Sequence, residues 1–146
     1  TLRTTAMVGF PSETEEDFEE LCNFVKEMRF DRFGAFTYSP EEGTVAALME
    51  NQIDEQTKQD RYDALMNIQL DISSELNKEK IGTVKTVLCE GFDGVARIYS
   101  GRSESDAPDV DGRVYFRSKR KIREGEFVKV RVNDSLDYDL IGEEEI

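Results

Sequence analysis

The spacing of apolar residues divides the chain into a helical stretch followed by an alternating one. Over residues 1–82, long segments repeat their apolar positions every three or four residues, which is the period of an α-helix. Over residues 83–146 the repeat is every second residue, which is typical of strands with one buried face. The net charge changes at the same place, from −10 to −3. We therefore predict two domains, 1–82 and 83–146.

The first domain begins as a strand–helix–strand unit. Residues 2–10 are rich in strand-forming residues and end at a Gly-Phe-Pro turn sequence. Thr14 and Asp17 have the spacing of a capping box, and apolar residues follow at helical spacing. A second strand is predicted over residues 32–39. The helix between the two strands is long enough for a parallel crossover.

A second, longer helix is predicted over residues 54–80. One of its sides is mostly apolar, so we expect that side to face the core. The opposite side is expected to be solvated and consists of Lys58, Asp60, Asp63, Asn67, Ser74 and Glu75. Two parallel strands and two helices cannot cover both faces of a sheet. We therefore expect residues 1–82 to be a slice of a larger α/β fold.

The second domain is predicted to be all β. Glycine-containing turn sequences separate short alternating segments. The predicted strands are 83–90, 95–102, 113–116, 126–132 and 138–141. Five short strands predict a small five-stranded antiparallel barrel, since closure removes exposed strand edges.

Composition excludes several classes of function. The 146 residues carry a net charge of −13, and 38% of them are hydrophobic, which is enough for a core. No apolar run approaches the ~20 residues of a membrane helix, so we expect a soluble, cytoplasmic protein without a membrane partner. The chain has no His, which excludes imidazole catalysis and His-ligated zinc. Cys22 and Cys89 cannot form a metal site by themselves and are predicted to be buried, reduced thiols.

Three motifs resemble one known family, the radical-SAM methylthiotransferases. LRTTAMVGFPSETEEDF at 2–18 is similar to the family's fifth strand and the helix after it, and FTYSPEEGT at 36–44 is similar to the sixth strand and its loop. A long helix and a β domain of the TRAM type follow in the same order. GRSESDAPDVDGRVYF at 101–116 resembles the branch of the family that modifies the twelfth small-subunit ribosomal protein. The resemblance covers essentially the whole chain.

The resemblance implies both a fold and a chemistry. The chain would be the C-terminal slice of a radical-SAM (β/α) partial barrel followed by an OB-like TRAM barrel. The complete enzyme would use S-adenosylmethionine and two 4Fe–4S clusters to methylthiolate the β-carbon of an aspartate. None of the family's cluster-binding cysteines is present in this sequence. The chain alone is therefore expected to bind no cofactor and no metal, to contain no catalytic residue and to be inactive.

The family's cofactor suggests contact residues at the ends of the two predicted strands. Ligands of parallel α/β sheets lie outside the carboxyl ends of the strands. In radical-SAM folds the fifth and sixth strands lie beside the adenine of the cofactor. The residues expected to contact it are Met7, Val8, Gly9, Phe36 and Tyr38. Ser12 stands where the family usually has glycine, which costs strain only if φ is positive there.

The β domain offers two alternative recognition surfaces. Residues 104–111, the acidic loop, contain four acids and would attract a basic ribosomal protein. The residues predicted to recognise the protein are Arg102, Ser103, Asp106, Asp109, Asp111 and Arg113. The alternative is RNA contact through Arg113, Arg117, Lys119, Arg120, Lys121 and Arg123, beside the aromatics Tyr99, Tyr115 and Phe116.

Three functions therefore stay open. The first is a methylthiotransferase that acts on the ribosomal protein, and the second is a tRNA methylthiotransferase of the same family. The third is an adaptor that binds protein or RNA without catalysis.

Overall fold

The computed structural model describes residues 1–146 and divides into two compact units, Thr1–Ile72 and Ser73–Ile146. The division falls within the long helix α2 (Glu55–Glu79). The predicted domain boundary after residue 82 stays a prediction. No helix combines the length and apolar character that a membrane span requires.

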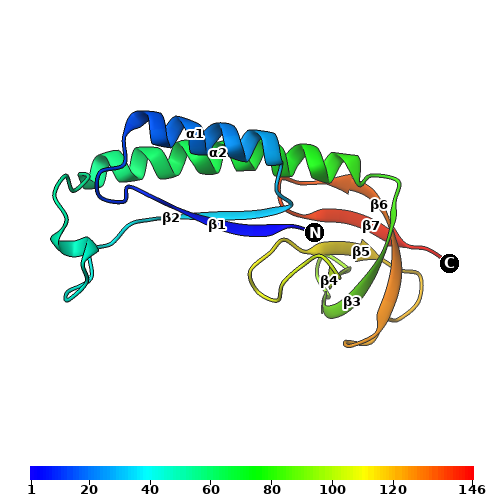
Figure 1. Ribbon diagram of the computed structural model, residues 1–146. Coiled ribbons are helices and arrows are strands. Elements are labelled where there is room, and N and C mark those ends of the chain that lie inside the picture. The colour runs from blue at the N-terminus through cyan, green and yellow to red at the C-terminus, as the bar shows by residue number, and fades with distance from the viewer. The chain divides into compact units, whose positions relative to one another are not determined.

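The first unit contains a two-stranded parallel sheet. Its elements are β1 (Arg3–Val8), α1 (Glu15–Met28), β2 (Arg32–Thr37), the short 3-10 helix η1 (Ala46–Leu48) and the beginning of α2. The strands pair along their whole length, from Arg3 beside Arg32 to Val8 beside Thr37. Helix α1 and the first part of α2 lie on the same face of this sheet (Figure 1). The predicted strand–helix–strand crossover is confirmed.

Helix α1 begins with the predicted capping box. The Thr14 hydroxyl accepts a hydrogen bond from the Asp17 N–H at 3.1 Å, and the Asp17 carboxylate accepts one from the Thr14 N–H at 2.9 Å. These bonds satisfy two donors that have no partner within the helix. The hydrogen bonds with Thr14 also lower the pKa of Asp17. The spacing of two residues in the sequence was therefore sufficient to locate this helix end.

The predicted solvated side of α2 is wrong at Lys58, which is only 2% exposed. The stem of Lys58 crosses Gly9, where an added Cβ would be 2.3 Å from the Lys58 Cγ. The Lys58 ammonium donates to the Glu55 carboxylate at 2.7 Å and lies 5.4 Å from the centre of the Tyr38 ring. Four apolar methylenes can be buried while the charge keeps a partner, and helical spacing alone does not reveal this.

The second unit is a closed five-stranded barrel. Its strands are β3 (Val84–Asp93), β4 (Ile98–Ser103), β5 (Val114–Arg117), β6 (Phe127–Ser135) and β7 (Leu140–Glu144), in the spatial order β3-β4-β5-β7-β6. Strand β6 alternates as predicted, with Val128, Val130 and Val132 buried. The barrel core consists of Val87, Cys89, Tyr99, Val114, Phe116, Ile122, Val128, Val130, Val132 and Leu140.

The prediction that all strands of the barrel are antiparallel is wrong. Strands β5 and β7 pair in parallel, with Val114 beside Leu140 and Arg117 beside Glu143. The other four pairings are antiparallel. Strand direction must alternate around a fully antiparallel ring, which requires an even number of strands. A closed barrel of five strands therefore contains at least one parallel pair.

Close backbone contacts between neighbouring strands of the barrel require glycine at two points. A Cβ on Gly142 would be 2.3 Å from the Arg131 carbonyl oxygen, and one on Gly101 would be 2.2 Å from the Leu88 carbonyl oxygen. Real Cβ atoms do not come so close to a backbone oxygen. Glycine at these positions lets neighbouring strands coil tightly enough to close a small barrel.

Candidate functional site

The first unit, Thr1–Ile72, is called the α/β unit below. Its sheet has an apolar surface on the face away from the helices. Met7 and Phe36 are register partners on β1 and β2, and they are 41% and 48% exposed. Val8, the next residue along β1, is fully buried and belongs to the opposite face. Two of the predicted cofactor contacts are therefore neighbours on an accessible apolar surface, whereas Val8 contributes its side chain to the core.

Tyr38 lies just beyond the end of β2 and is almost completely buried. Its N–H donates to the Val8 carbonyl oxygen at 2.8 Å, and its ring packs edge-on against Phe10 with centroids 5.2 Å apart. The Tyr38 hydroxyl is buried and has no hydrogen-bond partner. Such a group costs about 1–3 kcal/mol. A polar atom supplied by a ligand at this end of the sheet would remove that cost.

A buried ion pair holds the loop that connects β1 to α1. The Glu13 carboxylate accepts two hydrogen bonds from the Gly9 N–H, at 3.0 and 3.1 Å, and pairs with the Arg61 guanidinium at 2.7 Å. Arg61 also pairs with Glu15 at 2.5 Å. Burial acts to lower the pKa of Arg61, but the hydrogen bonds to Glu15 and Glu13 outweigh it and the pKa is raised. The loop at the carboxyl end of β1 is therefore fixed before any ligand binds.

Ser12 is strained in this loop. Its φ is +72°, and the Glu13 N–H donates to the Phe10 carbonyl oxygen at 3.0 Å, with Pro11 in between. Pro followed by a residue of positive φ is the pattern of a type II turn, for which glycine is preferred. The strained alternative that the sequence left open is therefore the one that the structure adopts.

The two cysteines have no metal-binding neighbours. Cys22 and Cys89 are buried and reduced, and burial raises the pKa of both thiols. No group of three or more His, Cys, Asp or Glu side chains is arranged to hold a metal ion. The residues of this chain do not provide the ligands of an iron–sulfur cluster.

Half of the residues predicted to recognise a protein form hydrogen bonds within the acidic loop. The Asp106 carboxylate accepts hydrogen bonds from the Ser103 N–H at 2.8 Å and from the Ser103 hydroxyl at 2.7 Å. The Asp111 carboxylate accepts one from the Ala107 N–H at 2.6 Å. Ser103 and Asp106 are buried. These three polar side chains therefore shape the loop.

The remaining predicted residues lie at the surface. The Asp109 side chain is 92% exposed and lies 3.9 Å from the Arg113 guanidinium, which is half exposed. Arg102 pairs with Glu90 at 2.7 Å. Val110, which the prediction did not include, is 74% exposed. The accessible tip of the acidic loop therefore combines one carboxylate with one apolar side chain.

The predicted basic cluster is only partly available to a ligand. Arg120 pairs with Glu126 at 2.5 Å and with Glu144 at 2.7 Å. These hydrogen bonds raise the pKa of Arg120, and the one from Arg120 lowers the pKa of Glu126. The cations that are exposed and form no ion pair are Arg117, Lys119, Lys121 and Arg123.

The predicted aromatic surface beside these cations is wrong at two of its three residues, and Tyr115 alone is partly exposed. Tyr99 is 8% exposed and Phe116 is fully buried, and their rings stack inside the barrel with centroids 5.4 Å apart. Alternation along β4 and β5 points both side chains inward. Neither ring can stack on a base.

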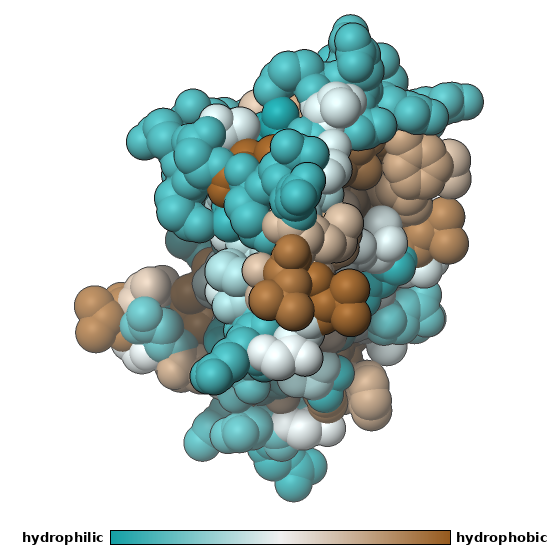
Figure 2. Space-filling model, turned by 60° about the vertical axis from the view of Figure 1, so that its left-hand side comes forward, coloured by the Kyte–Doolittle hydropathy of each residue, from teal (hydrophilic) through white to brown (hydrophobic).

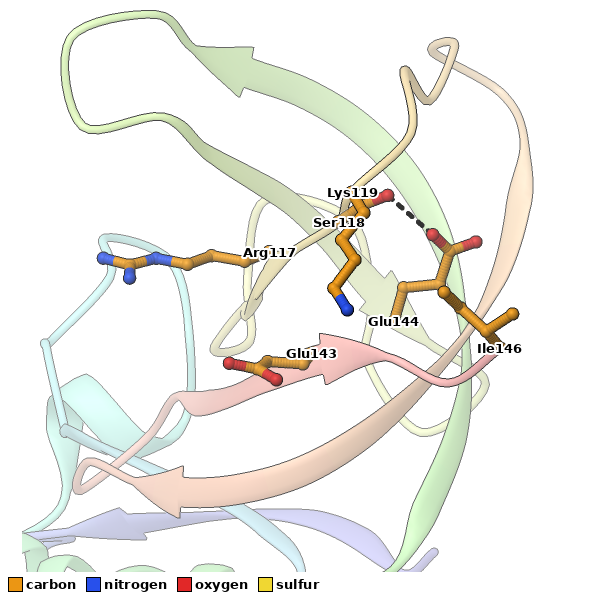
Figure 3. Close-up of a pocket in the computed structure, with 6 residues that line it drawn as sticks. All are labelled: Arg117, Ser118, Lys119, Glu143, Glu144 and Ile146. Atoms are coloured by element: carbon orange, nitrogen blue, oxygen red, sulfur yellow. Dashed lines mark hydrogen bonds between the residues drawn. The ribbon is translucent and has the colours of Figure 1, made fainter.

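A pocket of about 340 Å³ lies where β5 and β7 end side by side. It is lined by Arg117, Ser118, Lys119, Glu143, Glu144 and Ile146 (Figure 3). The Ser118 hydroxyl donates to the Glu144 carboxylate at 2.6 Å. The lining carries both signs of charge. Sequence reasoning missed this pocket because it depends on the parallel pairing, although Arg117 and Lys119 were predicted as part of a basic cluster.

Comparison with known proteins identifies a domain and a set of relatives. Residues 81–144 match the family model described as TRAM domain. The chain is 57% identical over 143 residues to "Ribosomal protein uS12 methylthiotransferase RimO" of Caldanaerobacter subterraneus subsp. tengcongensis, a match that covers 97% of the chain and 32% of that relative. Over nearly its whole length the chain is therefore similar to methylthiotransferases named RimO. Proteins of the same name from Desulforamulus reducens and Clostridioides difficile are 51% and 50% identical.

The RimO relatives confirm the resemblance that the sequence motifs indicated, including the TRAM domain. The chain spans about a third of the length of the curated relatives that it matches. The barrel described above coincides with the TRAM domain, since β3 to β7 all lie within residues 81–144.

Proposed function

We propose that the chain is part of an enzyme that methylthiolates the β-carbon of an aspartate in ribosomal protein uS12. The observation that carries the proposal is the 48–57% identity, over nearly the whole chain, to proteins named for action on uS12. The α/β unit would be a slice of a radical-SAM (β/α) barrel, and the TRAM barrel would bind substrate. The enzyme would act in the cytoplasm, where ribosomal proteins are made.

The α/β unit has features that suit S-adenosylmethionine. Met7 and Phe36 offer an apolar surface for an adenine ring, and the buried Tyr38 hydroxyl lacks a partner. Both features lie toward the carboxyl ends of β1 and β2, where ligands of parallel sheets bind. Val8 and Gly9 would shape the site without hydrogen bonds to the cofactor. The Gly9 N–H already donates to the Glu13 carboxylate, and the Val8 carbonyl oxygen already accepts from the Tyr38 N–H. When bound, this cofactor supplies the radical and methyl chemistry.

The two 4Fe–4S clusters of the proposed enzyme do not fit the residues of this chain. Cys22 and Cys89 are buried and lie in different units. We propose that other parts of the enzyme hold the clusters.

The acidic loop supports a protein substrate. Asp109 and Val110 are exposed at its tip, and Arg102 and Arg113 flank it. Phosphate groups would be repelled by Asp109 and the exposed Glu104, whereas a basic ribosomal protein would be attracted. Ser103, Asp106 and Asp111 would act by holding the loop in shape.

A tRNA methylthiotransferase is the second candidate. It is favoured by the four cations that are exposed and unpaired, Arg117, Lys119, Lys121 and Arg123, because unpaired cations attract phosphate. Against it, Glu143 and Glu144 lie beside Arg117 and Lys119 in the same pocket. The inward positions of Tyr99 and Phe116 also leave only Tyr115 of the stacking surface that was expected. An adaptor without catalysis is the third candidate and is tested by the same assay.

The test is an assay of the full-length protein, loaded with iron and sulfide and supplied with S-adenosylmethionine and a reductant. Purified uS12 and an unmodified tRNA are offered in separate reactions and analysed by mass spectrometry. A methylthio group on an aspartate of uS12 and none on the tRNA is the expected result. A modified tRNA with unmodified uS12 would make the second candidate correct, and no product on either would favour the adaptor.

A matched pair of double variants tests the cofactor surface. Met7→Ser/Phe36→Ser removes the apolar face and should weaken S-adenosylmethionine binding about tenfold, measured by equilibrium titration. Phe24→Ser/Met28→Ser changes side chains of similar exposure on α1 and should leave binding unchanged. Equal effects of the two variants would contradict this placement of the cofactor.

A further inference from the structure

Apolar side chains reach the surface in several separate patches among hydrophilic ones (Figure 2). One of these patches lies on the segment that joins β2 to α2. We call residues 39–54 the arm; it is drawn in teal and extends beyond the ends of β1 and β2 (Figure 1). Val45 and Leu48, three residues apart at η1, are 83% and 85% exposed, and Met49 is 37% exposed. Apolar side chains this exposed contribute little to folding.

The arm is nevertheless an ordered structure. The Thr44 hydroxyl donates to the Glu41 carbonyl oxygen at 2.8 Å and accepts from the Ala47 N–H at 3.2 Å. The Gln52 amide donates to the carbonyl oxygens of Ala46 and Met49, both at 3.0 Å. The arm therefore forms hydrogen bonds within itself while it directs two large apolar side chains to solvent.

The base of the arm is fixed at the edge of the sheet where the cofactor is proposed to bind. The Ser12 N–H donates to the Asn51 carbonyl oxygen at 2.9 Å, which joins the arm to the turn between β1 and α1. That turn is itself held by the Glu13–Arg61 ion pair. A partner that binds the arm would therefore lie close to the carboxyl ends of β1 and β2.

The charge of the arm selects the kind of partner. Residues 39–54 contain four acids and no Lys or Arg. Glu41, Glu42 and Glu50 are exposed and form no ion pair. An acidic rim around an apolar centre attracts a basic surface that offers an apolar recess, and it repels RNA.

We propose that the arm binds a basic protein surface, with Val45 and Leu48 entering an apolar recess and the three glutamates pairing with surrounding cations. This inference rests on the proposed function. The arm would be a second substrate-recognition element, which holds uS12 near the carboxyl ends of β1 and β2, where the cofactor is proposed to bind. The inference assigns a role to residues that no sequence motif marked as a binding site.

The test uses the full-length protein and purified uS12, with affinity measured at low and physiological salt. Val45→Ser/Leu48→Ser should weaken binding about tenfold or more, because two buried apolar side chains are lost. The control Val95→Ser/Leu136→Ser replaces exposed apolar residues outside the arm and should change affinity less than about twofold. Glu41→Lys/Glu50→Lys should weaken the binding of uS12, and the loss should be largest at low salt. The control Glu19→Lys/Glu27→Lys makes the same change of charge on α1 and should not weaken it in this way.

Unchanged affinity of the arm variant would overturn the proposal. So would a lower melting temperature of the Val45→Ser/Leu48→Ser variant without uS12, since it would show that the arm packs against the protein's own chain. Weaker binding of a tRNA with unchanged binding of uS12 would also overturn it. If the protein without substitutions does not bind uS12, the proposed function itself fails. The titration therefore distinguishes that failure from a failure of the arm alone.

Discussion

In the barrel every strand has two hydrogen-bonded neighbours, whereas each strand of the α/β unit has only one. The barrel encloses ten core residues, and Phe116 is the largest of those that are fully buried. The α/β unit instead leaves Met7 and Phe36 on an uncovered face and Val45 and Leu48 on the arm. The difference indicates that the barrel is stable through its own contacts, and that the α/β unit displays apolar surface for binding.

The largest expected effect compares two phenylalanines on strands of different units. Phe116→Ala should lower the free energy of unfolding by about 3–5 kcal/mol, because it leaves a cavity in the barrel core. Phe36→Ala removes a half-exposed ring and should cost less than about 1 kcal/mol. Urea denaturation followed by circular dichroism measures both. Similar losses would mean that Phe36 is as well packed as the barrel core.

The second prediction concerns the ion pair that fixes the loop after β1. Arg61→Ala leaves the Glu13 carboxylate, 12% exposed, without its cation and should destabilise the protein by about 3 kcal/mol. Lys26→Ala on the exposed side of α1 is the control and should cost less than about 0.5 kcal/mol. Thermal denaturation provides the comparison. A loss at Arg61 no larger than at Lys26 would show that the loop does not depend on the pair.

A pair of glycine substitutions then tests how tightly each sheet is packed. Gly142→Ala places a Cβ against the Arg131 carbonyl oxygen and should cost about 1–3 kcal/mol or more. Gly34→Ala on β2 meets no atom within 4 Å, so it should be neutral or stabilise by up to about 1 kcal/mol. The midpoint of urea unfolding is the readout. A tolerated Gly142→Ala would contradict the close backbone approach in the barrel.

The smallest effect is a stabilisation in the α/β unit. Ser12→Gly removes the strain of a positive φ, but it adds entropy to the unfolded chain. The net gain should be about 0.5–1 kcal/mol, measured as a higher melting temperature. Glu42→Gly, at an exposed position without a positive φ, should instead be neutral or slightly destabilising. A melting temperature lowered by Ser12→Gly would show that the turn is not strained.

Local patterns in the sequence predicted local structure well. The Thr14–Asp17 capping box, the parallel crossover and the alternation of Val128, Val130 and Val132 are all present. The parallel β5–β7 pair was missed because it depends on how distant strands close a ring. Counting the strands would have been enough to find it, since an odd ring cannot be fully antiparallel.

Site residues were harder to predict because one residue type can serve two purposes. Asp106 and Asp109 are three positions apart in the same acidic loop. Asp106 is buried and accepts a hydrogen bond from Ser103, whereas Asp109 is exposed. Lys58 has the sequence context of a surface lysine, and its burial depends on the close contact with Gly9. Tyr99 and Phe116 lie near the exposed cations in the sequence, but the register of β4 and β5 directs them inward.

The proposed enzyme recognises the protein uS12 and not tRNA. The most direct measurement is a titration of the chain with purified uS12 and, in parallel, with a tRNA anticodon arm, each at low and physiological salt. We expect saturable binding of uS12 that persists at physiological salt, and weak binding of the RNA. Tighter binding of the RNA, falling steeply as salt rises, would contradict it.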